Sequence, residues 1–61
     1  MEKRAKGDAE HLFHPPVTAD RLRVTKKEVD GPFALITVES PRGMEVILRY
    51  AWRTKQLLGS V

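Results

Sequence analysis

Hydrophobic and polar residues alternate most regularly in the middle of the chain, in two stretches on either side of a turn. The first stretch, FALITVE, covers residues 33–39, and the second, MEVILRY, covers residues 44–50. Alternation with a period of two is typical of β-strands. The Ser-Pro-Arg-Gly segment between them suits a type I turn, because proline presets φ at the second position and glycine follows at the fourth. The sequence therefore predicts a β-hairpin over residues 33–50.

The pairing of these two strands depends on the length of the loop. A three-residue loop with a bulge at Gly43 sets Val38 opposite Val46 and Ile36 opposite Leu48. A two-residue loop would instead set Val38 opposite a glutamate. We favour the bulged turn because it leaves one face of the hairpin wholly apolar below the turn, and a slip by one residue would move every side chain to the other face.

The second face of the predicted hairpin mixes apolar and charged positions. Phe33, Leu35 and Ile47 lie on it, and two glutamates and an arginine alternate with them. An antiparallel sheet with one solvated face normally shows a cleaner alternation. We therefore expect these three apolar residues to contact another segment of the chain, a partner protein or a second copy.

A third strand is predicted before the hairpin, over residues 21–29, with a turn at Asp30-Gly31. Lysines toward its far end are typical of a strand at the edge of a sheet. Together the strands predict a three-stranded antiparallel meander over residues 21–29, 33–39 and 44–50. In the first strand, Leu22 and Val24 are expected on one side, opposite Arg21, Arg23, Thr25 and Lys27.

The segment after the hairpin admits two interpretations. Ala51, Leu57 and Leu58 recur at helical spacing and Gly59 follows, which predicts a short C-terminal helix packed on the sheet. The alternation of Tyr50, Trp52 and Thr54 would also suit a strand. The predicted fold class is thus α+β, a small three-stranded meander with a short C-terminal helix; the alternative is a small all-β, barrel-like sheet.

The first 17 residues are expected to form a flexible or weakly helical basic arm. Ala5, Ala9 and Leu12 share a helical spacing, but Gly7 interrupts it, and Pro15-Pro16 ends any helix. The remaining residues, 18–61, are expected to form a single small β-rich domain.

Composition adds a size limit and a charge. The chain has 61 residues, of which 41% are hydrophobic and 31% charged, and it has no cysteine. Such a composition suits one globular domain, and a domain this small is marginal alone without disulfides, so we expect a dimer or other homo-oligomer. No apolar stretch approaches the length of a membrane span or a signal core, so we expect a cytoplasmic protein without a membrane partner.

Catalytic and metal-binding patterns are not found. His11 and His14 are three residues apart, but the proline after His14 disfavours helical dihedrals there, and no third ligand is suitably spaced. Ser40 and Ser60 have no base in their sequence context, and the four glycines are isolated. The sequence predicts a non-enzymatic protein with no metal site and no cofactor.

The strongest functional signal is basic residues interleaved with aromatic ones, on a chain of formal net charge +3. Cationic side chains neutralise phosphates and tryptophan stacks on bases, which predicts a regulatory module that binds nucleic acid. The alternative is a protein–protein interaction module that uses Phe33, Leu35 and Ile47. The predicted nucleic-acid-binding residues are Arg21, Arg23, Lys27, Arg42, Arg49, Trp52, Arg53 and Lys55.

Overall fold

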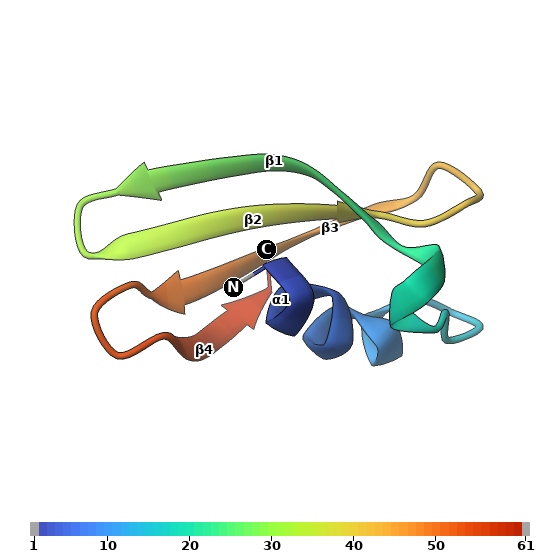
Figure 1. Ribbon diagram of the computed structural model, residues 1–61, viewed down its shortest axis with the longest axis horizontal. Helices are drawn as coiled ribbons and strands as arrows, with labels where there is room; N and C mark the ends of the chain where they lie inside the picture. Colours follow the sequence, from blue (N-terminus) through green and yellow to red (C-terminus); the bar gives the residue numbers. More distant parts are fainter. Residues whose placement is uncertain (1, 61) are drawn as a thin grey trace.

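Four antiparallel strands form one open sheet, and a helix lies across one face of it (Figure 1). The computed structural model describes residues 2–60. Neighbouring strands in the sheet are also neighbours in the chain, so the topology is a meander. The elements are α1 (Glu2–Ala9), the 3₁₀ helices η1 (Glu10–Leu12) and η2 (Ala19–Arg21), β1 (Arg23–Asp30), β2 (Phe33–Glu39), β3 (Glu45–Ala51) and β4 (Gln56–Ser60).

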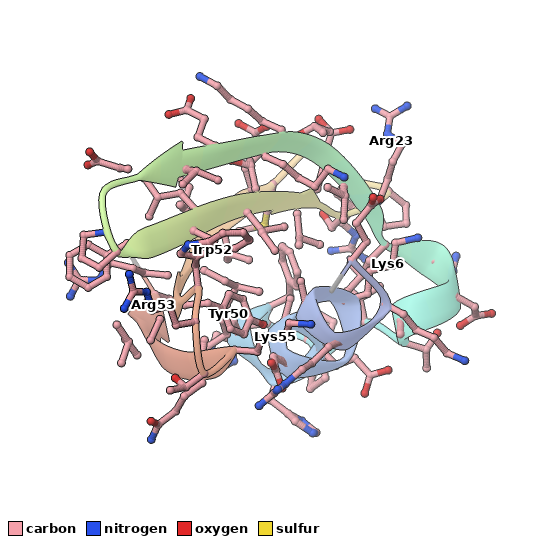
Figure 2. The ribbon with its side chains drawn as sticks, turned by 60° about the vertical axis from the view of Figure 1, so that its left-hand side comes forward. Lys6, Arg23, Tyr50, Trp52, Arg53 and Lys55 are labelled. Carbon is pink, nitrogen blue, oxygen red and sulfur yellow. The ribbon has the colours of Figure 1, made fainter. Side chains whose placement is uncertain are left out.

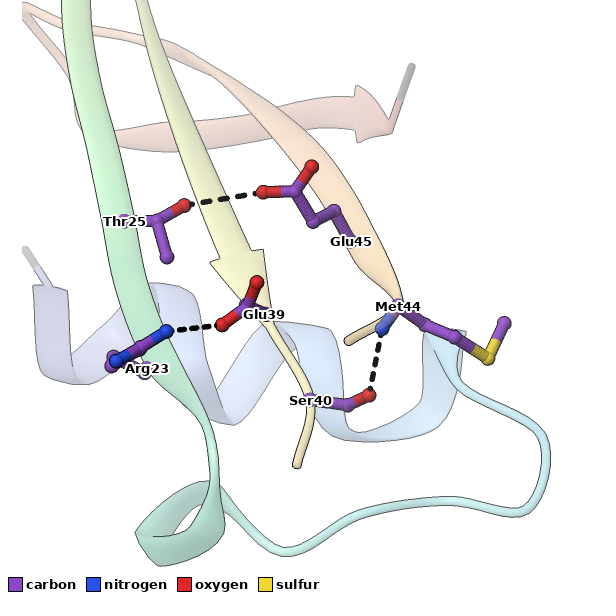
Figure 3. A network of polar contacts seen from close by, with 6 residues as sticks. All are labelled: Arg23, Thr25, Glu39, Ser40, Met44 and Glu45. Atoms are coloured by element: carbon purple, nitrogen blue, oxygen red, sulfur yellow. Dashed lines mark hydrogen bonds and ion pairs between the residues drawn. The ribbon is translucent and has the colours of Figure 1, made fainter. Parts of the chain in front are cut away.

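The hairpin of β2 and β3 has the predicted bulged turn and the predicted register. Val38 pairs with Val46 and Ile36 pairs with Leu48. Gly43 has a φ of 84°, in the left-handed region that glycine tolerates, and its N–H donates to the Ser40 carbonyl at 2.9 Å. The Ser40 N–H donates to the Met44 carbonyl at 2.8 Å, and Ser40 Oγ accepts from the Met44 N–H at 3.3 Å (Figure 3). These bonds hold the turn on which the alternation of the two strands depends.

Strand β1 contains an irregularity that the alternation does not reveal. The pairing with β2 shifts between Val24 and Lys26, so that Thr25 is an extra residue. Beyond this bulge each side chain changes sides: Lys27 pairs with Ile36, on the face that α1 covers. The expectation that Arg23 and Lys27 share a face is therefore wrong, because a bulge inserts one residue into a period of two.

The C-terminal segment is a strand, so both the three-stranded count and the C-terminal helix are wrong. Residues 52–55 turn, and β4 then pairs with β3, with Tyr50 opposite Leu57 and Arg49 opposite Gly59. A helix of about eight residues gains little stability by itself. As a strand, the same residues satisfy main-chain groups along the edge of β3 that would otherwise lack partners. The sheet stays open, with β1 and β4 at its edges, so it is not barrel-like.

The helix of the fold lies instead at the N-terminal end, and it shares one hydrophobic core with the sheet. Ala5 and Ala9 of α1 are fully buried, and Phe13 just beyond η1 is 2% exposed. Small alanine side chains let the helix backbone approach the sheet closely. The buried hydrophobic residues are Ala5, Ala9, Phe13, Leu22, Ala34, Ile36, Val38, Leu48 and Tyr50.

Two glycine substitutions test these local structures in opposite directions. Gly7 lies in α1 with open space where a Cβ would be, so Gly7→Ala should raise the free energy of unfolding by about 0.5–1 kcal/mol. At Gly43, alanine would be strained by the positive φ, so Gly43→Ala should lower the free energy of unfolding by about 1 kcal/mol. Urea unfolding followed by circular dichroism measures both. No gain from Gly7→Ala would contradict a folded helix over residues 2–9.

Candidate nucleic-acid interface

The two faces of the sheet differ in what lies on them. α1 packs on the face that carries Ile36, Val38, Leu48 and Tyr50. The opposite face, here called the open face, is not covered by any part of the chain that the structure describes. Its apolar residues are half-buried among charged neighbours: Phe33, Leu35, Ile47 and Ala51, together with Thr37. The three residues predicted as a partner interface, Phe33, Leu35 and Ile47, therefore lie together on the open face.

The predicted basic residues do not form one surface. Arg42 lies in the β2–β3 turn, and Arg21 and Arg23 lie at the same end of the sheet. Trp52, Arg53 and Lys55 lie in the β3–β4 loop at the other end, as the separation of Arg23 from Trp52 in Figure 2 shows. The seven residues of β3 separate the two ends by roughly 23 Å.

Three of the predicted residues contact other side chains of the same chain. The Lys27 ammonium lies 2.6 Å from a Glu2 carboxylate oxygen of α1. The Arg49 guanidinium lies on the open face, 5.3 Å from the centroid of the Phe33 ring, at a distance suited to a cation–π contact. Arg23 forms an ion pair with Glu39, on the open face (Figure 3).

The β3–β4 loop holds an exposed tryptophan between two strands. Its backbone is tied at both ends: the Trp52 N–H donates to the Pro32 carbonyl at 3.0 Å, and the Lys55 N–H donates to the Ala51 carbonyl at 2.6 Å. Trp52 is 49% exposed, so it is not a core residue. From residue 46 to residue 61 the sequence contains no aspartate or glutamate. The loop therefore presents an accessible indole beside Arg53 and Lys55.

A hollow of about 320 Å³ adjoins Trp52 on the helix-bearing face. Val29, Ala34 and Ile36 give it apolar walls, and Val29 is 65% exposed. Glu2 and Glu28 also line it, and both carboxylates are paired, with Lys27 and Lys26, each at 2.6 Å. An apolar slot beside an indole, with its rim charges neutralised, suits a flat apolar group.

A second hollow, of about 280 Å³, lies at the other end of the sheet, between the 13–18 segment and the β2–β3 turn. Arg21 and Arg42 both line it, so the fold brings together two predicted residues that are far apart in the sequence. Phe13 and Met44 contribute apolar surface there. The exposed ring at this hollow is the imidazole of His14, whereas the hollow at Trp52 has the larger indole.

Tyr50 has a structural position and is not available for stacking. Its side chain is fully buried, and its hydroxyl donates to Asp8 Oδ2 at 2.6 Å, which joins β3 to α1. Burial raises the pKa of the Tyr50 phenol well above its usual value of 10, and the Asp8 carboxylate raises it further. Asp8 also lies 3.9 Å from Arg4, one turn earlier in the helix.

The features that sequence reasoning missed arise from contacts between distant segments. Nothing in the sequence around Lys27 indicates its pairing with Glu2, 25 residues away. The slot beside Trp52 combines residues from α1, β1, β2 and the β3–β4 loop. The turn at residues 52–55 has no glycine, proline, asparagine or aspartate, so its sequence lacks the usual turn signals.

Within residues 2–60, no group of three or more histidines, aspartates or glutamates is placed to hold a metal ion. The helices in this part of the chain are too short and too polar to cross a membrane. Comparison with protein-family models, with curated proteins and with solved structures finds no match to this chain.

The Tyr50–Asp8 bond predicts a measurable pH dependence. Tyr50→Phe should lower the free energy of unfolding by about 1–2 kcal/mol at neutral pH, because it removes a hydrogen bond to a carboxylate. Because the folded-state pKa of Tyr50 is raised, its contribution is complete below pH 10 and is lost as pH rises above that value.

Denaturant unfolding of both proteins between pH 8 and pH 11 measures the effect, and the variant should lose less stability than the parent as the pH rises. Tyr50 is the one tyrosine in the sequence, so its ionisation can be followed by absorbance. Ionisation at an ordinary pKa in the folded protein would contradict the buried contact.

Proposed function

We propose that this protein is a non-enzymatic module that binds single-stranded nucleic acid through the β3–β4 loop. The observation that carries the proposal is the exposed Trp52 ring, in the same loop as Arg53 and Lys55 and in a segment without carboxylates. Aromatic side chains that accept unpaired bases, together with cations that contact phosphates, are the common means of binding single strands.

In this proposal the indole of the loop binds a base, and the cations of the loop bind phosphates. A base stacks on Trp52 and extends toward the apolar slot lined by Val29 and Ile36. Arg53 and Lys55, in the same loop, contact the phosphates on either side of that base. A base in a duplex is already stacked, so this arrangement favours single strands over duplexes.

The backbone conformation of Lys55 supports a binding role for its side chain. Lys55 has a φ of 59°, a left-handed conformation that costs a residue with a Cβ about 1 kcal/mol. Glycine would relieve this strain, but it would also remove a cation from the loop. Strain retained at one exposed position is a feature of binding sites.

The other predicted basic residues have lesser roles in this proposal. Lys27 is paired with Glu2 and Arg23 with Glu39, so each has its charge largely neutralised. Arg21 and Arg42 line the hollow at the far end of the sheet, where only a strand long enough to follow β3 would reach them from the loop. Regulation of nucleic-acid function through such binding remains part of the proposal.

Removal of the indole tests the stacking. Trp52→Ala should weaken binding of a short oligonucleotide by about 1–3 kcal/mol, roughly five- to 150-fold, since one base loses its stacking partner. Fluorescence anisotropy at low salt measures the affinity. Leu58→Ala, which removes another exposed apolar side chain from the same end of the chain, is the control and should bind normally. Equal losses in both variants, or no binding by the parent protein, would sink the proposal.

The salt dependence tests the cations. Arg53→Ala combined with Lys55→Ala should reduce the slope of log affinity against log salt by about 1.4, because two phosphate contacts are lost on a single strand. Lys26→Ala removes a cation that is paired with Glu28 and should leave the slope unchanged. A change of slope from Lys26→Ala of about half that of the double variant would indicate non-specific attraction to net charge, because it removes one cation and the double variant removes two.

Lys55→Gly separates binding from stability. We expect it to raise the free energy of unfolding by about 1 kcal/mol through relief of the left-handed strain. The same change should weaken oligonucleotide binding. Parallel thermal unfolding and anisotropy measure the two effects, and a variant that gains stability without any loss of affinity would remove Lys55 from the site.

A further inference from the structure

The open face carries charges that change sign from one end of the strands to the other. On β1, Arg23 and Lys26 lie on it toward the β2–β3 turn, and Glu28 and Asp30 follow toward the other end. The bulge at Thr25 produces this order, because it brings Lys26 and Glu28 to the open face. On β3 the order is opposite, with the glutamate nearer the turn (Glu45) and the arginine at the other end (Arg49).

We infer that the open face binds a second copy of this chain, with the strands of the two copies running in reversed directions. In that arrangement β1 lies over β1 of the second copy and β3 lies over β3, with the two-fold axis at the level of Ile47, so that Arg23 faces Glu28 of the other copy. Lys26 lies near the axis, where it stays paired with Glu28 of its own chain. Across the two-fold axis, Glu45 of each copy is brought toward Arg49 of the other. Such an isologous contact uses the same patch twice, and it works only when the patch is complementary to its own reversed image.

Packing with the strands of the two copies in the same direction is less favourable. It brings both β2–β3 turns to one end, where Glu39 and Glu45 of the two copies gather. Like charges in close contact across an interface are costly. Reversal separates these carboxylates and matches them with the arginine end of the other copy.

The apolar residues at the centre of the open face supply the remaining contact. Leu35 and Ile47 lie near the middle of the face. Thr37 lies beside them, paired with Lys26 of β1 on one side and with Ile47 on the other. The face is about 19 Å across its four strands and about 26 Å along β1, or roughly 500 Å². This is below the roughly 800 Å² per partner of a standard stable interface, so the dimer is expected to be weak, with a dissociation constant of micromolar order or higher.

The inference does not rest on nucleic-acid binding, but it has a consequence for it. Reversed packing brings the Trp52 end of one copy to the Arg42 end of the other. The predicted basic residues that a single chain keeps at opposite ends of the sheet would then lie at the same end of the dimer. Each end would offer one β3–β4 loop and the hollow lined by Arg21 and Arg42 of the second copy.

Glu45 and Arg49 provide a clean test, because neither forms an ion pair within the described chain. Sedimentation equilibrium of the protein alone, over micromolar to millimolar concentrations, should show a reversible monomer–dimer equilibrium. Glu45→Arg and Arg49→Glu should each weaken dimerisation about tenfold or more, since each puts like charges in contact twice by symmetry. The double variant should restore it to within about threefold. Lys3→Glu, in α1 on the opposite face of the sheet, is the control and should leave the equilibrium unchanged.

The oligomeric state of the parent protein and of the double variant tests the proposed dimer directly. A monomer at millimolar concentration, or a dimer that the double variant fails to restore, overturns the inference. If circular dichroism shows that a variant folds poorly, NMR spectra of the parent protein at several concentrations test the dimer instead. Its amide resonances at Leu35, Ile47 and Arg49 should shift with concentration, while those of Ala5 and Ala9 should not. Shifts confined to the α1 side or to the β4 edge would place the contact elsewhere and refute it.

Discussion

The register of the β2–β3 hairpin is the constraint on which the rest of the structure depends. Ser40 and Gly43 close the turn with main-chain bonds, and the left-handed φ at Gly43 supplies the bulge that aligns Val38 with Val46. This alignment gathers the apolar side chains of both strands on one face, where α1 covers them. A shift by one residue would expose that set and bury the glutamates and the arginine instead.

Two interruptions of the regular pattern shape the surfaces for which functions are proposed. The bulge at Thr25 moves Lys27 next to Glu2 and moves Lys26 and Glu28 to the open face. The left-handed backbone at Lys55 closes the loop that presents Trp52. A chain of 61 residues has a small surface. A single irregular residue therefore changes which charged and aromatic side chains face solvent over a large share of it.

The helix and the sheet stabilise each other through one small core. α1 has alanines on its buried side, and it gains a specific anchor from the hydrogen bond between Asp8 and Tyr50. A helix of eight residues is not stable in isolation, so its order depends on this docking. The opposite side of the sheet has no such cover among residues 2–60, so its apolar residues stay half-buried.

Local chemistry was enough to predict the central hairpin, its bulged turn and the antiparallel meander, because turn residues and alternation act over a few positions. It also placed Phe33, Leu35 and Ile47 on one face, but it grouped Trp52, Arg53 and Lys55 with cations that lie at the other end of the sheet. Tertiary structure alone decided that residues 56–60 form a strand, since their helical spacing competed with the free edge of β3. It also decided that residues 2–9 form the covering helix, because only contact with the sheet offsets the loss of conformational freedom in so short a segment.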